Sequence, residues 1–409
     1  MTEMGMRNTK SSTPPSRTAN WRLLALLMLM TGVGPATLNI LVPALPTLVK
    51  ALATDTATVQ LTLSLYLFSF ATAQLVLGPL SDRFGRRPVI LGALALNTAV
   101  SIAAIAASSI HMLIVARILQ AIGASGGVVI SRAIIRDLYD RDRAAGMIGL
   151  VTTAMVIAPM VAPLVGGLLD TAFGWEAIFF AIALLASTAV VWAYFMLPET
   201  RPASAPQSPG LLVGEWLSLL RHPRFYGYIL IGAFGSAPFF IFLGGAPHVV
   251  VSLMGRTSAE YGLWFAVMSL GYMSGNFTVS RLSQRYGVDA LILAGLIFEL
   301  VGCLMAAGLM HVYANASPAA IFLPQIIVSY GNGLLMANCL SGAISIRPQA
   351  AGSASGMAGF VQMSIGAAST QIVSFLLVGA ATGLPMAWMA VVAISLGCVA
   401  YVALVRRRK

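Results

Sequence analysis

The sequence predicts an all-α membrane protein with twelve transmembrane helices in two six-helix halves and both termini in the cytoplasm. Of the 409 residues, 58% are hydrophobic and only 9% are charged, whereas soluble domains carry about 25% charged residues. The apolar residues gather in windows of about 20 residues, which is the length that crosses a bilayer as a helix. The strict alternation of membrane β-strands is absent from the sequence.

The apolar windows place the spans in order along the chain. They fall at residues 22–46, 58–80, 88–108, 112–135, 146–169, 177–197, 224–247, 259–281, 290–310, 318–341, 352–378 and 385–405. A segment rich in proline and serine follows the sixth span, so we expect halves at 21–197 and 224–405 joined by a cytoplasmic loop at 198–223. Residues 1–20 and 406–409 are expected to form a disordered and a basic cytoplasmic tail. The first window is too long for a signal peptide.

The positive charges fix the expected orientation. All but three of the 24 lysine and arginine residues lie on one side of this topology; Lys50 and Arg256 lie on the other side, and Arg117 is inside the fourth span. Cytoplasmic loops carry an excess of lysine and arginine, so this side is expected to be cytoplasmic. The net charge of +11 therefore reflects topology and does not indicate nucleic-acid binding.

No motif in the sequence indicates an enzyme. There is no phosphate-binding loop after a strand, no paired metal ligands and no nucleophile beside a base. Cys303, Cys339 and Cys398 lie in apolar windows and are expected to be packing residues. We expect no metal site and no cofactor.

The turn between the second and third spans carries the first functional motif. Its residues follow the order G-x-L-x-D-R-x-G-R-R, with Gly78, Asp82, Arg83, Gly85, Arg86 and Arg87 at the fixed positions. The glycines suit a tight turn, and Asp82 is placed to cap a helix or to pair with an arginine. The spacing resembles the signature loop of the major facilitator superfamily of transporters; an ordinary basic turn is the alternative. A partial copy at 282–287 suggests duplicated halves.

Two further spans carry motifs that resemble those of this superfamily. In the fourth span, Arg117 and Gln120 match R-x-x-Q-G with alanine as the last residue. The resemblance links this arginine to proton transfer, and a structural arginine is the alternative. The fifth span contains Gly149, Pro159, Pro163, Gly166 and Gly167, which resemble the motif of exporters. It implies a bent helix that favours export; generic small-residue packing is the alternative.

The end of the first span reads Leu-Asn-Ile-Leu-Val-Pro-Ala-Leu-Pro at residues 38–46. This segment resembles the bicyclomycin/chloramphenicol-resistance (Bcr/CflA) branch of drug:proton antiporters. Asn39 occupies the position where the branch usually has an aspartate, so this chain must carry the proton elsewhere or couple differently. Glu299 is the one acid deep in a span. It is a candidate for proton coupling by default, and a neutral, hydrogen-bonded structural acid is the alternative. Asp82 is expected to pair with Arg132 or Arg136 and to cap the eleventh span near Ser353.

The superfamily resemblance also implies which spans line a substrate cavity. Candidate lining residues in those spans are Asn39, Tyr66, Gln74, Ser125, Phe239, Phe240, Phe242, Tyr272, Asn276 and Gln362. A mostly apolar pocket with a few polar groups is the usual small-molecule site. No acid is evident among these positions, which favours neutral or zwitterionic substrates over multivalent cations.

These observations lead to one functional expectation. The chain is expected to be a monomeric secondary transporter in a bacterial inner membrane that exports small drug-like molecules, with the proton gradient as its energy source. An uptake symporter for a metabolite is the nearest alternative, and a membrane sensor or scaffold without transport is another.

Overall fold

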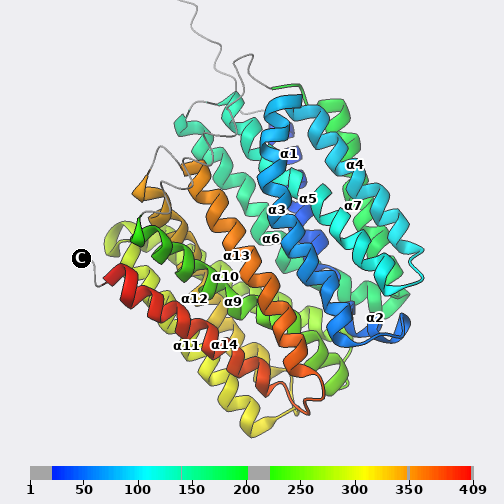
Figure 1. Ribbon diagram of the computed structural model, residues 1–409, viewed down its shortest axis with the longest axis vertical. Coiled ribbons are helices and arrows are strands. Elements are labelled where there is room, and N and C mark those ends of the chain that lie inside the picture. Colours follow the sequence, from blue (N-terminus) through cyan, green and yellow to red (C-terminus); the bar gives the residue numbers. More distant parts are fainter. Residues whose placement is uncertain (1–20, 140, 201–221, 348–350, 407–409) are drawn as a thin grey trace, which may run out of the picture.

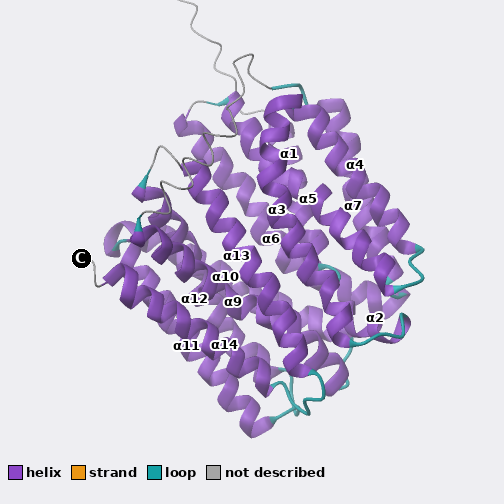
Figure 2. Cartoon of the chain, in the orientation of Figure 1, coloured by secondary structure: helices purple, strands orange, loops and turns teal. Residues whose placement is uncertain are grey.

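A computed structural model describes residues 21–139, 141–200, 222–347 and 351–406 (Figure 1). Every regular element in these ranges is helical (Figure 2). The all-α prediction is therefore confirmed for the described chain. Most of the predicted central loop, the N-terminal tail and the last three residues lie outside these ranges.

The first group of helices comes from residues 21–196. It contains α1 (Trp21–Asn39), which continues through a 3₁₀ turn (Val42–Ala44) into α2 (Leu45–Ala51), then α3 (Thr56–Phe84), α4 (Arg86–Ile105), α5 (Ile110–Leu138), α6 (Arg141–Phe173) and α7 (Glu176–Met196). The second group contains α9 (Pro223–Pro247) with a π-helical extension (His248–Leu253), α10 (Ser258–Tyr286), α11 (Val288–Tyr313), α12 (Ala319–Ile346), α13 (Ala351–Leu377) and α14 (Leu384–Ala400) with an extension (Tyr401–Val405).

Eleven helices of the described chain are long and apolar enough to cross a membrane, one fewer than the sequence predicted. The exception is α10, which covers the expected span at 259–281 and has 29 residues. Its length exceeds the bilayer core at about 1.5 Å per residue, but its many serine, tyrosine and asparagine side chains make it less apolar. A Cβ added at Gly271 or Gly275 would lie 2.3 Å from a carbonyl oxygen of α12. One face of α10 is thus packed tightly against α12.

Figure 1 shows the two groups side by side, coloured from blue to green and from green to red. They meet where α6 packs on α10 and where α3 packs on α13. Within each group the helices pack mainly on members of the same group, for example α5 on α3 and α4, and α12 on α10 and α11.

Single glycines make two equivalent turns between helices. Gly85 separates α3 from α4 with φ +104°, and Gly287 separates α10 from α11 with φ +77°. These are left-handed conformations that favour glycine. Gly287 ends the partial copy of the signature motif, so the two groups share this construction. We call the end of the bundle that bears Gly85 and Gly287 the loop end, and the other end the opposite end.

Side-chain caps start three helices at the opposite end. Asp55, Ser109 and Thr257 accept hydrogen bonds from the backbone N–H groups three residues later, at 2.9, 3.3 and 3.1 Å. Such N-caps satisfy donors that a helix leaves free. The hydroxyl of Thr58 also donates to Asp55, and these bonds hold the pKa of this carboxyl below its usual range.

Candidate functional site

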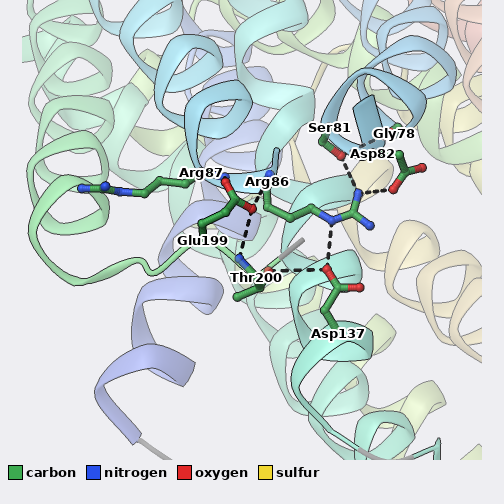
Figure 3. Close-up of polar contacts among 8 residues, drawn as sticks. All are labelled: Gly78, Ser81, Asp82, Arg86, Arg87, Asp137, Glu199 and Thr200. Carbon is green, nitrogen blue, oxygen red and sulfur yellow. Dashed lines mark hydrogen bonds and ion pairs between the residues drawn. The ribbon is translucent and has the colours of Figure 1, made fainter. Parts of the chain in front are cut away.

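Arg86 is the centre of a polar cluster at the loop end (Figure 3). Its Nη1 lies 2.5 Å from Oδ1 of Asp82, and its Nε lies 3.0 Å from Oδ2 of Asp137. Nη1 also donates to Oγ of Ser81 at 2.7 Å, and Ser81 donates to the carbonyl of Gly78 at 2.8 Å. Because Arg86 is only 8% exposed, its bonds are poorly screened by water. They tie the ends of α3, α4 and α5 together.

The partner of Asp82 differs from the sequence expectation. Asp82 pairs with Arg86 in its own turn, and the described residues contain no ion pair between Asp82 and either Arg132 or Arg136. Gly85 turns the chain sharply between them, and this turn brings Arg86 at the start of α4 against Asp82 in the last turn of α3. The side chain of Ser353, the expected cap site, lies outside the described residues.

Glu199 completes the cluster from the segment after α7. Its Oε1 and Oε2 accept the backbone N–H groups of Arg86 and Arg87, at 2.9 and 3.1 Å (Figure 3). A carboxylate at a helix N-terminus is favourable because the free N–H groups and the helix dipole are positive there. A Cβ at Gly85 would lie 2.6 Å from Oε2 of Glu199, which gives a second reason for glycine at this turn.

The remaining arginines of the motif lie at the periphery of the cluster. Arg87 donates from Nη2 to the carbonyl of Tyr194 at 2.7 Å. The guanidinium of Arg83 lies 5.2 Å from the ring centroid of Phe84. Of the three arginines, Arg86 alone forms ion pairs with other described residues.

Arg117 lies in the interior of the first group and is fully buried. Its Nε donates to the carbonyl of Thr62 at 3.2 Å, and its Nη1 donates to the carbonyl of Thr37 and to Oε1 of Gln120, both at 3.0 Å. Its guanidinium carbon lies 4.3 Å from the centroid of the Tyr66 ring. Carbonyl dipoles and an aromatic face thus solvate the charge, and no described carboxylate pairs with it.

This environment limits what Arg117 can do. A guanidinium stays protonated in proteins, so Arg117 supplies a fixed positive charge and does not carry a proton itself. Gln120 extends the network, because its Nε2 donates to Oγ of Ser101 on α4 at 2.8 Å. The R-x-x-Q spacing therefore joins α1, α3, α4 and α5 around one charge.

Asn39 ends α1 with its side chain turned back on the helix. Its Nδ2 donates to the carbonyl of Pro35 at 2.8 Å, and its Oδ1 has no partner among the described residues. At 2% exposure it is enclosed by protein. An amide cannot titrate, so this position holds no proton in this chain.

The small residues of α6 allow close helix approach near the opposite end only. A Cβ at Gly166 would lie 1.8 Å from the carbonyl oxygen of Ile40, and one at Gly167 would lie 2.2 Å from that of Ser258. A Cβ at Gly149 would meet nothing within 4 Å. The helix runs unbroken through Pro159 and Pro163.

Asp170 lies one turn beyond Gly166 and joins the two groups of helices. Its Oδ2 accepts from Oγ1 of Thr47 at 2.8 Å and from Oγ of Ser258 at 2.6 Å. Beside it, the backbone N–H of Ala259 donates to Oγ1 of Thr171 at 3.2 Å. These bonds connect α2 and α6 of the first group with the first turn of α10.

Gln371 of α13 makes the second connection. Its Oε1 accepts from Oγ of Ser64 at 2.9 Å, and its Nε2 donates to the carbonyl of Ala57 at 3.0 Å. Between described residues of the two groups, hydrogen bonds are confined to these two places, and both lie toward the opposite end. In the described conformation the two groups are therefore hydrogen-bonded to each other toward the opposite end.

The ten cavity candidates fall into two sets. Five are fully buried, namely Asn39, Tyr66, Ser125, Phe240 and Phe242. Five are partly exposed, namely Gln74, Phe239, Tyr272, Asn276 and Gln362. Phe242 packs in an aromatic cluster with Phe265 and Phe322, which is a packing role in this conformation.

Glu299 is enclosed in the second group, away from the contacts between groups. Its Oε1 accepts from Nδ2 of Asn332 at 3.3 Å, and its Oε2 has no partner in the described chain. The same Nδ2 of Asn332 donates to the carbonyl of Gly235 at 3.0 Å. Because Glu299 is fully buried and no described cation pairs with it, an ionised carboxylate here would be costly.

Comparison with known proteins identifies the family that combines these features. Residues 27–370 match the family described as the Major Facilitator Superfamily. The chain belongs to the major facilitator superfamily. It is thus a multi-pass membrane transporter for small molecules, and the resemblance inferred from the signature loop is confirmed.

Similar superfamily members have names that concern drug resistance. Multidrug resistance protein D of Escherichia coli is 31% identical over 85% of this chain and 86% of its own length. A chloramphenicol resistance protein of Pseudomonas aeruginosa is 30% identical over 82% and 79%. A bicyclomycin resistance protein homolog of Haemophilus influenzae is 25% identical over 83% and 85%.

Solved structures of the superfamily share the fold. A bacterial homolog of the human lysosomal transporter Spinster, described as inward-facing and unoccupied, superposes with a TM-score of 0.75 at 14% identity, over 95% of this chain and 98% of that one. A D-xylose–proton symporter superposes with a TM-score of 0.73 at 15% identity, over 92% and 97%.

Three residues that make hydrogen bonds between distant segments of this transporter were not predicted from the sequence. Glu199, Asp170 and Gln371 each bond across elements distant in sequence. A signal existed for Glu199, which follows a span on the same side as the signature loop. Asp170 stands next to the small-residue motif, but no local pattern shows that α10 will contact it. Nothing in the local sequence distinguishes Gln371.

Proposed function

We propose that this protein exports small, neutral or zwitterionic drug-like molecules across a bacterial inner membrane in exchange for protons. The observation that carries the proposal is the close contact of the exporter-type helix α6 with α10 at Gly167, across the two groups of helices. The names of the similar proteins, which concern resistance to several drugs, to chloramphenicol and to bicyclomycin, support the same substrate class.

We infer that the two groups are six-helix halves. Helix α10 is then also a span, and it brings the number of spans to twelve. A 29-residue helix packed against α6 and α12 has the length to cross the bilayer, and protein covers three of its polar side chains, those of Ser258, Tyr261 and Ser269. The excess of arginine at the loop end supports a cytoplasmic position for that end and for both termini.

With this orientation, the opposite end faces the outside and the described conformation is closed to the outside. Transport by alternating access then requires the contacts at Asp170, Gln371 and Gly167 to open. The cluster around Arg86 lies within the first half and near the cytoplasm. It is placed to keep the ends of three helices together while the halves move.

Proton movement supplies the energy. One charge that crosses 100 mV yields about 2.3 kcal/mol, which sustains a concentration ratio of about fifty-fold for a neutral solute. Arg117 supplies a fixed field in the first half, and Glu299 can take part only if another conformation opens a path to it. The lining candidates that remain partly exposed, such as Phe239, Tyr272 and Gln362, offer an apolar surface with a few amide and hydroxyl groups.

Accumulation assays test the proposal. The protein is expressed in an efflux-deficient bacterium, and uptake of several neutral, zwitterionic and cationic antibiotics is measured with and without a protonophore. Lower accumulation of the neutral or zwitterionic compounds, restored by the protonophore, is the expected result. Higher accumulation in expressing cells would indicate uptake instead, and equal accumulation of all compounds would contradict drug export.

A further inference from the structure

We propose that Asp170 takes up a proton when the outer end of the transporter closes, so that closure of this end responds to external acidity. The inference rests on the alternating-access scheme above, but it does not depend on any substrate. It gives the chain a residue that can bind and release a proton during the cycle. Asn39 cannot do this, and Glu299 is fully buried in the described conformation.

One of the two hydrogen bonds of Asp170 crosses between the halves and belongs to the closed arrangement. Oγ of Ser258 belongs to α10 in the second half, whereas Oγ1 of Thr47 belongs to α2 in the first half. When the halves separate, Ser258 must leave and water replaces it. Asp170 is therefore 8% exposed when the end is closed and hydrated when it is open.

The charges around Asp170 favour its neutral form in the closed state. Two hydroxyls donate hydrogen bonds to Oδ2 of Asp170, while its buried Oδ1 has no partner in the described chain. Glu176 of α7 is a nearby charge of the same sign. At this end of the packed elements, the other charged residues are Lys50 on α2, Glu260 on α10 and Arg256 just before α10. No ion pair joins Lys50 or Arg256 to Asp170 among the described residues. Burial of a carboxylate without a cation is costly.

The sign of the pH effect follows from this difference. If the closed state holds the proton more tightly than the open state, lower external pH shifts the equilibrium toward the closed state. For one proton, the closed-to-open ratio changes by at most about tenfold per pH unit. External protons would thus drive the outer end shut after a substrate has been released.

Distances between two spin labels test the proposal. Ala51 at the end of α2 and Ser252 after α9 are exposed positions on the two halves, and both are changed to cysteine for labelling in a Cys398→Ser background. The full-length protein is reconstituted in lipid nanodiscs at pH 5 and pH 8. We expect the short-distance, closed population to grow at pH 5 in the otherwise native protein. Asp170→Asn, which is neutral at any pH, should be closed at both.

Matched variants make the test decisive. Glu260→Gln removes a nearby acid that does not contact Ser258, and it should retain the native pH response. Ser258→Ala, which keeps Asp170 titratable, should reduce the closed population at both pH values but still respond to pH. A native distance distribution that is unchanged between pH 5 and pH 8, or a full pH response in Asp170→Asn, would overturn the proposal. Neither readout requires transport, so a failure of drug export in the accumulation assay is a separate result.

Discussion

A methyl group at Gly167 should open the outer end of the transporter. The added Cβ would lie 2.2 Å from the carbonyl oxygen of Ser258 and 2.8 Å from its carbonyl carbon, whereas ordinary contact begins near 3.4 Å. The difference from 2.2 to 3.4 Å is 1.2 Å. Both atoms belong to the backbone of α10, so no flexible side chain can yield and the helices themselves must separate.

The expected magnitude follows from the cost of overpacking. Extra methyl groups in tightly packed positions typically cost about 1–3 kcal/mol. The cost falls on the closed arrangement, since α10 moves away from α6 when the outer end opens. A free energy of this size changes a two-state ratio by about 5- to 150-fold. Gly167→Ala should therefore shift the label distances between positions 51 and 252 toward the long, open population by a factor in this range.

Gly149→Ala is the matched control on the same helix. Its Cβ would meet nothing within 4 Å, and alanine is the better helix former. We expect native distances and native drug accumulation in this variant. Identical distance distributions and transport in Gly167→Ala and the native protein would refute the reasoning, because they would show that the closed contact is not as tight as the structure describes.

Three further substitutions test the rest of the site. Glu199→Gln should lower the thermal stability of the purified protein, because it removes the negative charge that caps α4. A charge at a helix end contributes about 0.3–1 kcal/mol. A melting curve identical to the native one would argue against the cap. Arg117→Lys keeps the charge but cannot reach both the Thr37 and Thr62 carbonyls. We expect drug export to fall and the free energy of unfolding to drop by about 1–3 kcal/mol for each carbonyl left without its donor. Drug accumulation and thermal melting measure the two effects. Glu299→Gln should leave drug accumulation within about twofold of native, since a neutral amide still accepts from Asn332; loss of proton-dependent export in a folded Glu299→Gln protein would instead make Glu299 the coupling acid.

The helices and the turn at Gly85 were predictable because local rules decide them. Apolar windows of about 20 residues must form helices in a membrane, where backbone groups have no water to bond. Glycine at a sharp turn follows from its conformational freedom, and its φ of +104° agrees. Helix α10 is the exception: the sequence predicts a span at 259–281, but its polar side chains leave it outside the eleven described helices that are long and apolar enough to cross a membrane.

The partners of the charged residues were less predictable. Asp82 was expected to pair with Arg132 or Arg136, yet the turn at Gly85 brings Arg86 against it. Around Arg117 the structure supplies carbonyl oxygens and the Tyr66 ring, and no described carboxylate. Backbone carbonyls are present at every position, so a sequence cannot show which of them will face a given side chain.

The two ends of the bundle differ in the kind of bond that they use, and this difference fits a cycle in which one end must open. Around Arg86 the bonds are charge-assisted and stay within one half, where nothing has to separate. Between the halves they are bonds from hydroxyls, an amide and one backbone N–H, each worth about 1 kcal/mol net when neutral. Four such bonds hold a closed state that thermal motion and a bound substrate can open. The bond of Ser258 to Asp170 is the one among them whose acceptor can change its charge, so it is the contact at which a proton can alter the balance between the two states.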